Sequence, residues 1–200
     1  ILLPDSTGFT FDPIHKKVLF NDEQDLAVKK IIKAINKNKF KSFLLHGVTG
    51  SGKTEIYIQL IAQELKKKKK ILYLLPEIAI TTQIIQRLQS FFGNRVGVYH
   101  SRFSLAERTE LWYSMMNEKL HQYDIILGAR SAIFLPFKDL GLIIVDEEHE
   151  TSYKQIDPSP RYNARDVASK MAQIHNSKLL LGSATPSMEM MELVEQKKIG

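Results

Sequence analysis

The segment from Gly47 to Thr54 reads GVTGSGKT and follows the apolar run 43–45, with one histidine between them. This is the pattern G-x-x-x-x-G-K-[ST], which connects a buried strand to a helix and binds phosphate groups. Its glycines let the backbone turn tightly, so that N–H groups and the positive end of the helix dipole face one anion. The lysine can reach the β- and γ-phosphates, and the last hydroxyl can bind Mg²⁺. The pattern therefore predicts a nucleoside triphosphate site made of Gly47, Val48, Thr49, Gly50, Ser51, Gly52, Lys53 and Thr54.

A group of acidic residues, Asp146-Glu147-Glu148-His149, directly follows the apolar run 142–145. A carboxylate at the tip of a buried strand can reach Mg²⁺ directly or through its water shell. The next carboxylate can orient and deprotonate the water that attacks the γ-phosphate. We therefore assign Asp146, together with Thr54, to the metal and Glu147 to the water, with Glu148 as the alternative for the water. His149 either connects this site to its surroundings or forms only local hydrogen bonds.

A third polar segment, from Gly182 to Thr185, follows the apolar run 179–181. The hydroxyl groups of Ser183 and Thr185 can hydrogen-bond carboxylates at the end of a neighbouring strand. Ligands of parallel sheets bind at the carboxyl ends of the strands. We therefore expect this segment, the phosphate loop and the acidic residues to meet at one edge of a sheet, with Lys53, Asp146 and Glu147 as the catalytic residues.

Short apolar strands alternate with helical segments along the chain, which predicts an α/β fold with a mainly parallel sheet and helices on both faces. Strands are expected near residues 43–45, 71–75, 96–99, 124–128, 142–145 and 178–181. Helices are expected from residue 21, from the phosphate loop to the lysine run 66–70, and over about 79–92, 104–118 and 163–175. Ser104 with Glu107 forms a capping box, Asn163 is a helix cap, and Pro186 suits the first turn of a last helix. Residues 1–20 show no period and are expected to be an irregular lead-in to one domain over residues 21–200.

Composition excludes several kinds of protein. The chain has no cysteine, so it contains neither a disulfide framework nor a cysteine zinc site, which is compatible with the cytoplasm. No apolar stretch approaches the roughly 18 residues of a membrane helix. Five consecutive lysines account for most of the net charge of +6. A lysine run at the end of a helix complements the helix dipole and keeps the surface soluble, and we favour this interpretation over a contact with DNA, which remains the alternative.

The three polar segments together resemble motifs I, II and III of the superfamily-two helicases of the DEAH type, and within these the helicases of the primosome. The resemblance implies a RecA-like P-loop NTPase domain that spans most of this chain. It rests on LLHGVTGSGKTEIY (44–57), LLPEIAIT (74–81), HSRFS (100–104), ILGARSAIF (126–134), IIVDEEHETSYKQ (143–155), PRYNARDVA (160–168) and LGSATPSME (181–189).

Further site residues follow from this resemblance. Gln24 matches the glutamine with which such helicases read the adenine edge. The segment after the acidic residues is similar to an aromatic-rich loop that senses single-stranded DNA, and aromatic rings and basic side chains suit that task. Local packing of its tyrosines is the alternative. The residues expected to bind DNA or couple it to the nucleotide are Arg130, His149, Tyr153, Lys154, Arg161, Tyr162, Arg165, Ser183 and Thr185.

The resemblance also implies ATP and Mg²⁺ as ligands, with single-stranded and forked DNA, replication-restart proteins and a second RecA-like domain as partners. We expect a cytoplasmic 3′-to-5′ DNA helicase of which this chain is the first motor domain, with slow turnover on its own because the arginine finger is on the second. A zinc module is expected outside this chain. A nucleotide-binding switch, a small-molecule kinase and a passive docking module are the alternatives, but the guanine-reading motif Asn-Lys-x-Asp fails at Lys39.

Overall fold

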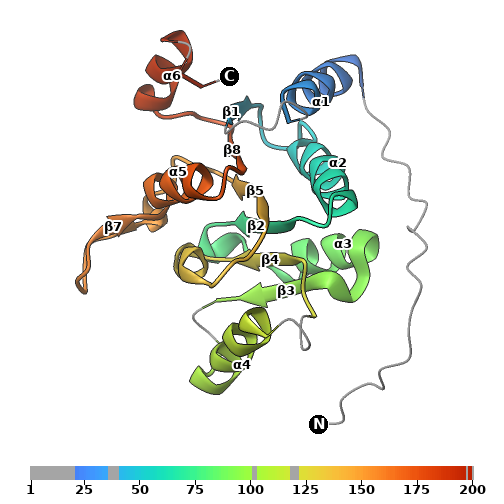
Figure 1. The fold of residues 1–200 in the computed structure, drawn as a ribbon. Coiled ribbons are helices and arrows are strands. Elements are labelled where there is room, and N and C mark those ends of the chain that lie inside the picture. The colour runs from blue at the N-terminus through green and yellow to red at the C-terminus, as the bar shows by residue number, and fades with distance from the viewer. Residues whose placement is uncertain (1–20, 36–40, 101–102, 118–121, 197, 200) are drawn as a thin grey trace.

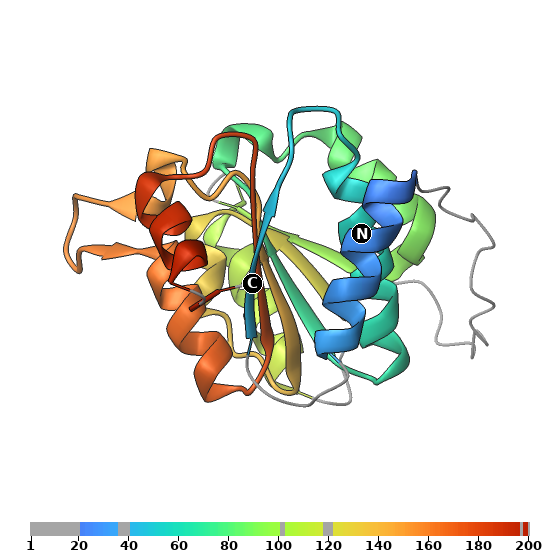
Figure 2. The same cartoon turned by 90° about the horizontal axis from the view of Figure 1, so that it is seen from above.

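The computed structural model describes residues 21–35, 41–100, 103–117, 122–196 and 198–199. The expected lead-in at 1–20 and residues 101 and 102 of the segment 100–104 lie outside these ranges. The main element is a six-stranded parallel sheet with the order β1-β8-β5-β2-β4-β3. Helices cover both of its faces (Figures 1 and 2). The predicted α/β fold is confirmed.

The elements follow one another as the apolar pattern predicts. The strands of the large sheet are β1 (Lys41–His46), β2 (Lys70–Leu74), β3 (Val96–Tyr99), β4 (Ile125–Gly128), β5 (Leu140–Val145) and β8 (Lys178–Ser183). The α-helices are α1 (Asp22–Ile35), α2 (Lys53–Lys66), α3 (Thr82–Phe92), α4 (Leu105–Met116), α5 (Ala164–Ile174) and α6 (Met188–Glu195). Short 3₁₀ turns are η1 (Glu77–Ala79), η2 (Gly93–Arg95), η4 (Arg130–Phe134) and η5 (Thr151–Tyr153), and a small antiparallel pair is formed by β6 (Lys154–Gln155) and β7 (Tyr162–Asn163).

The core has two parts, one on each face of the sheet. Successive side chains of a strand point to opposite faces. Ile71 and Tyr73 of β2 therefore pack with α1, α2 and α3, whereas Leu72 and Leu74 pack with α4, α5 and α6. Because both faces are covered, both sets must be apolar, which is why the strands read as continuous apolar runs.

Two predicted helix starts need correction. The helix expected from about Ala79 begins at Thr82, because η1 intervenes and the side chain of Thr81 accepts a hydrogen bond from the N–H of Ile84. The last helix begins after Ser187, whose hydroxyl caps it, so Pro186 precedes its first turn. The capping box of α4 and the cap Asn163 of α5 are confirmed.

The lysine run lies at the amino ends of the strands, away from the phosphate loop. Helix α2 ends at Lys66, and three of the four lysines that follow pair with nearby acids. Lys67 pairs with Glu64 at 2.8 Å, and Lys69 pairs with Asp139 at 3.0 Å. These contacts agree with a local role for the run. Among the described residues, no helix is long and apolar enough to cross a membrane.

Candidate functional site

The phosphate loop follows β1 and ends where α2 begins at Lys53. Gly50 and Gly52 have φ angles of 78° and 84°, a left-handed conformation that glycine adopts without steric cost. Gln24 of α1 packs against the loop, since its Nε2 donates to the carbonyl oxygen of Ser51 at 2.7 Å. A Cβ atom on Gly52 would lie 2.2 Å from the same nitrogen. The structure thus brings Gln24 to the predicted nucleotide site, and its reading of adenine stays a prediction.

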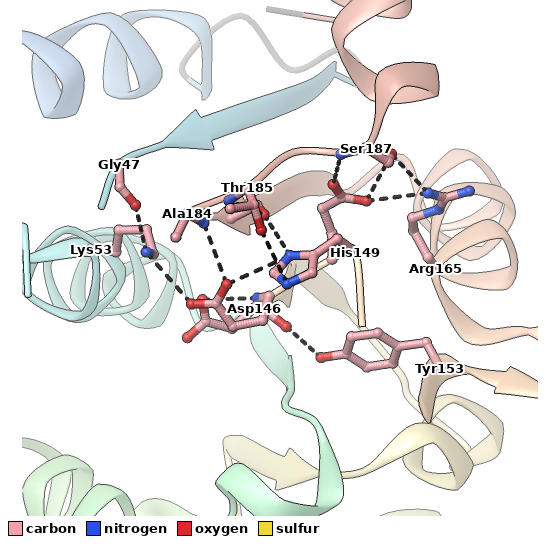
Figure 3. A network of polar contacts seen from close by, with 12 residues as sticks. Gly47, Lys53, Asp146, His149, Tyr153, Arg165, Ala184, Thr185 and Ser187 are labelled. Atoms are coloured by element: carbon pink, nitrogen blue, oxygen red, sulfur yellow. Dashed lines mark hydrogen bonds and ion pairs between the residues drawn. The ribbon is translucent and has the colours of Figure 1, made fainter. Parts of the chain in front are cut away.

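Lys53 connects the loop to the acidic residues. Its side chain is nearly buried, and Nζ donates to the carbonyl oxygen of Gly47 at 2.7 Å. The same nitrogen lies 3.6 Å from Oε1 of Glu147 (Figure 3). A cation and a carboxylate therefore face each other at the carboxyl end of the sheet, as predicted from the sequence.

Asp146 and Glu147 follow the last residue of β5. Glu147 has a φ of 48°, which is uncommon for a residue with a side chain, and such backbone strain is concentrated at functional sites. Its Oε2 accepts the N–H of Ala184 at 3.4 Å and lies 3.8 Å from Nδ1 of His149. Glu147 is thus held between the phosphate-loop lysine and the segment after β8.

His149 is joined to the end of β8 and to the segment that follows it. Its Nδ1 lies 2.7 Å from the hydroxyl oxygen of Ser183, and its Nε2 lies 3.3 Å from that of Thr185. Ser183 also accepts the N–H of Thr185 at 3.1 Å. The three polar segments identified in the sequence therefore meet, and His149 connects two of them.

The carboxylate of Asp146 is hydrogen-bonded by two buried tyrosines. The hydroxyl of Tyr57 donates to Oδ1 at 2.9 Å, and that of Tyr73 donates to Oδ2 at 3.0 Å. Burial raises the pKa of the Asp146 carboxyl, although the two tyrosine hydrogen bonds act in the opposite direction. Burial and the neighbouring Asp146 charge raise the pKa of both tyrosine hydroxyls well above the ordinary value, so they remain donors. Sequence reasoning missed these tyrosines because they occur within apolar runs, where only the need of a buried hydroxyl for a partner distinguishes them.

Tyr153 does not have the exposed position that base stacking requires. Only 1% of it is exposed, and its hydroxyl donates to the carbonyl oxygen of Asp146 at 2.6 Å. This ring is part of the core next to α5, and the expected role of the residue in binding DNA or coupling it to the nucleotide stays a prediction. The local-packing alternative holds for this tyrosine, and its hydroxyl joins η5 to the acidic residues.

Arg165, which is expected to bind DNA or to couple it to the nucleotide, forms ion pairs within the domain. Its guanidinium pairs with Glu148 at 3.2 Å and with Glu189 at 2.8 Å, and its side chain is 11% exposed. The other oxygen of Glu148 accepts the N–H of Ser187 at 3.0 Å. Both groups are therefore occupied by partners inside the domain, and the completely buried Glu148 side chain is not available to orient a water.

The other residues that are predicted to bind DNA form a separate group beside the nucleotide site. They are Arg130, Lys154, Arg161 and Tyr162. Arg130 donates through Nη1 to the carbonyl oxygens of Ser152 and Lys154 at 3.3 and 3.0 Å. Its guanidinium carbon lies 5.9 Å from the centre of the Tyr162 ring, which also contacts Phe134 edge-on. The hairpin of β6 and β7 has a hollow of about 440 Å³ lined by Lys154, Gln155, Ile156, Arg161, Tyr162 and Asn163.

The chemistry of the phosphate loop and the acidic residues fits a nucleotide bound together with Mg²⁺. Among the described residues, no cluster of three or more acidic, histidine or cysteine side chains could hold a metal ion alone. Thr54 and Asp146 offer one hydroxyl and one carboxylate, so the ion would be bound together with the phosphates. Lys53, the backbone of the loop and the start of α2 provide the positive charge for those phosphates.

Comparisons with known proteins agree with this arrangement. The sequence model of the DEAD/DEAH box helicase family matches residues 21–193 of this chain. The chain is 48% identical over 170 residues to the replication restart protein PriA of Bacillus subtilis (strain 168), covering 84% of this chain and 20% of that protein. It is 43% identical over 182 residues to PriA of Haemophilus influenzae (strain ATCC 51907 / DSM 11121 / KW20 / Rd), covering 91% and 24%. The chain thus spans about a fifth to a quarter of the length of these relatives.

Solved structures support the fold. RecG bound to a three-way DNA junction matches with a TM-score of 0.65 and 22% identity, over 88% of this chain and 22% of that one. The DUF1998 helicase MrfA bound to DNA matches with a TM-score of 0.61 and 19% identity, over 88% and 24%. At this identity the likeness concerns the arrangement of strands and helices.

Proposed function

Because this chain belongs to the DEAD/DEAH box helicase family, we propose that it is the ATP-binding first motor domain of a PriA-like DNA helicase. The proposed activity is 3′-to-5′ unwinding of forked DNA during replication restart, in the cytoplasm. The observation that supports it most directly is the approach of Lys53 to Glu147 at 3.6 Å, beside Asp146.

Each of these side chains has one task in the proposed reaction. Lys53 would pair with the β- and γ-phosphates, and Thr54 and Asp146 would hold Mg²⁺. The bound ion would offset the negative charge of the phosphates during their transfer. Glu147 accepts a proton from the attacking water, and its left-handed backbone aims the side chain at the phosphate loop.

The hairpin and η4 are the proposed contact for single-stranded DNA. Lys154 and Arg161 are exposed, and Tyr162 presents an aromatic ring in the same hollow. Basic side chains offset phosphate charge, and aromatic rings stack on bases of any sequence. Arg130 and Ser131 line a second hollow of about 370 Å³ next to the hairpin, which extends the basic surface.

The same residues suggest how DNA binding reaches the nucleotide. Arg130 holds the carbonyl oxygens on both sides of Tyr153, and Tyr153 holds the carbonyl oxygen of Asp146. A change in the hairpin would therefore act on the metal ligand through one buried hydroxyl.

A second RecA-like domain would supply an arginine finger, which is worth about 10³–10⁵ in rate in other phosphate-cleaving enzymes. Replication-restart proteins are the proposed partners, and a zinc module would lie elsewhere in the longer protein.

Steady-state ATP hydrolysis by the full-length protein, with and without single-stranded DNA, tests this proposal. We expect strong stimulation by DNA, and we expect Glu147→Gln to bind ATP but to hydrolyse it at least a hundredfold more slowly. Arg161→Ala should raise the DNA concentration needed for half-maximal stimulation. Hydrolysis that is indifferent to DNA would favour the nucleotide-switch alternative, and wild-type turnover of Glu147→Gln would refute the assignment of the base.

A further inference from the structure

The side chain of Asp146 is held by donors from different elements of the fold. Tyr57 belongs to α2 and Tyr73 to β2, and neither has any exposed surface. Their rings contact each other edge-on, with centroids 5.5 Å apart and planes at 79°. Edge-to-face contact is a preferred arrangement of aromatic pairs, and the close packing of the core holds both rings in place. The two hydroxyl groups therefore have fixed positions next to the carboxylate.

The donors occupy most of the acceptor capacity of this carboxylate. A carboxylate offers about four lone-pair positions. Oδ1 accepts the hydroxyl of Tyr57 at 2.9 Å and the N–H of Glu147 at 3.1 Å, and Oδ2 accepts the hydroxyl of Tyr73 at 3.0 Å. About one position remains, and it is on Oδ2. Two donors on different oxygens also fix the rotation of the carboxylate about its own bond.

Gly182 of β8 makes room for this arrangement. A Cβ atom at this position would lie 1.8 Å from the hydroxyl oxygen of Tyr57 and 3.0 Å from Oδ1 of Asp146. Any other residue would displace the hydroxyl from the carboxylate. The strand that pairs with β5 thus has no side chain at the point where the tyrosine approaches.

Satisfying two buried hydroxyls would not by itself require this carboxylate. A main-chain oxygen is a sufficient acceptor, as it is for Tyr153. Two hydroxyl groups from separate elements instead converge on the two oxygens of the one side chain that is assigned to the metal. Partners of this kind orient a ligand and adjust its affinity for the ion.

We propose that Tyr57 and Tyr73 are positioning residues that fix the Asp146 carboxylate so that Oδ2 faces the magnesium ion of the bound nucleotide. This inference rests on the proposed function, in which Asp146 holds that ion. Both tyrosines are completely buried, and they act only through Asp146.

The test measures the affinity of the full-length protein for a fluorescent ADP analogue, once with Mg²⁺ and once with EDTA. The ratio of the dissociation constant in EDTA to that in Mg²⁺ measures how much the metal increases the affinity, and we call this ratio the metal-dependent gain. We expect Tyr57→Phe and Tyr73→Phe each to reduce this gain about 10-fold to 100-fold and to leave the affinity in EDTA unchanged. Gly182→Ala should reproduce Tyr57→Phe, since it displaces the same hydroxyl. The matched control is Tyr113→Phe on α4, because Tyr113 is 64% exposed and its replacement should keep the wild-type gain.

Three results would overturn the inference. An unchanged gain in both phenylalanine variants would mean that the hydroxyl groups do not position the ligand. An equal loss of affinity with and without Mg²⁺ would indicate a purely structural role, which thermal unfolding of the same variants would show independently. A wild-type protein that binds the analogue without any gain from Mg²⁺ would refute the assignment of Asp146, and with it the metal part of the proposed function.

Discussion

Replacing Arg165 by methionine should destabilise the domain strongly, because this arginine is the cationic partner of a buried carboxylate. Glu148 has a side chain with 0% exposure, and Arg165 approaches it at 3.2 Å. Removing one partner of a buried ion pair costs about 3–5 kcal/mol, since the other charge is left without compensation. Ser187 still donates its N–H to Glu148, so the lower end, about 3 kcal/mol, applies. For a domain of this size, that corresponds to a decrease of about 6–12 °C in Tm.

Thermal unfolding followed by circular dichroism measures this decrease. The matched control is Arg161→Met, an exposed arginine of the hairpin, which should change the free energy of unfolding by less than about 0.5 kcal/mol. Adding Glu148→Gln to Arg165→Met removes the uncompensated charge and should recover part of the lost stability. The reasoning is refuted if Arg165→Met unfolds at the wild-type temperature and loses DNA affinity, because Arg165 would then contact DNA as the sequence suggested.

Three further changes test other parts of the structure. Lys53→Ala should weaken binding of the nucleotide analogue at least tenfold in an equilibrium titration, because it removes the cation that faces the phosphates; unchanged affinity would contradict the site. Burial raises the pKa of Asp124, but hydrogen bonds from Lys70 and Arg95 outweigh this effect and lower the pKa below its usual value. These contacts therefore stabilise the fold above the unfolded-state pKa of about 3.9 and are lost as the pH falls through the lower folded-state value. Asp124→Asn should be less stable than wild type to urea at pH 7, with a smaller difference near pH 3, and an equal difference at both would contradict the shift. Ser104→Ala should cost about 1 kcal/mol in the same urea assay, since it removes the capping box of α4, and no change would show that α4 does not need its cap.

The fold and the nucleotide site could be predicted because their signals are local. Each strand is a short apolar run, and the phosphate loop and the acidic residues are contiguous in sequence. The order of the strands could not be read in this way, because β1 pairs with β8 from the other end of the chain. The residue types of a strand do not show which distant strand will pair with it.

The positions of single side chains could not be predicted where a distant partner decides them. Arg165 and Tyr153 have the residue types of a DNA surface, but Glu148 and the Asp146 carbonyl hold them in the interior. Tyr57 and Tyr73 look like core residues, and their partner is 89 and 73 positions away. A sequence pattern reports the chemistry of a side chain, whereas its partner is set by packing.

The pairing of β1 with β8 has a consequence for the synthesis of the chain. In the part that the structure describes, β1 is at one edge of the sheet and β8 is its only neighbour. The phosphate loop follows β1, and its first N–H, that of Gly47, donates to Ser183 at the end of β8. A ribosome therefore completes the loop early but adds the strand that holds it only after more than a hundred further residues. Until then the nascent protein has the residues to recognise a nucleotide without the framework to bind one.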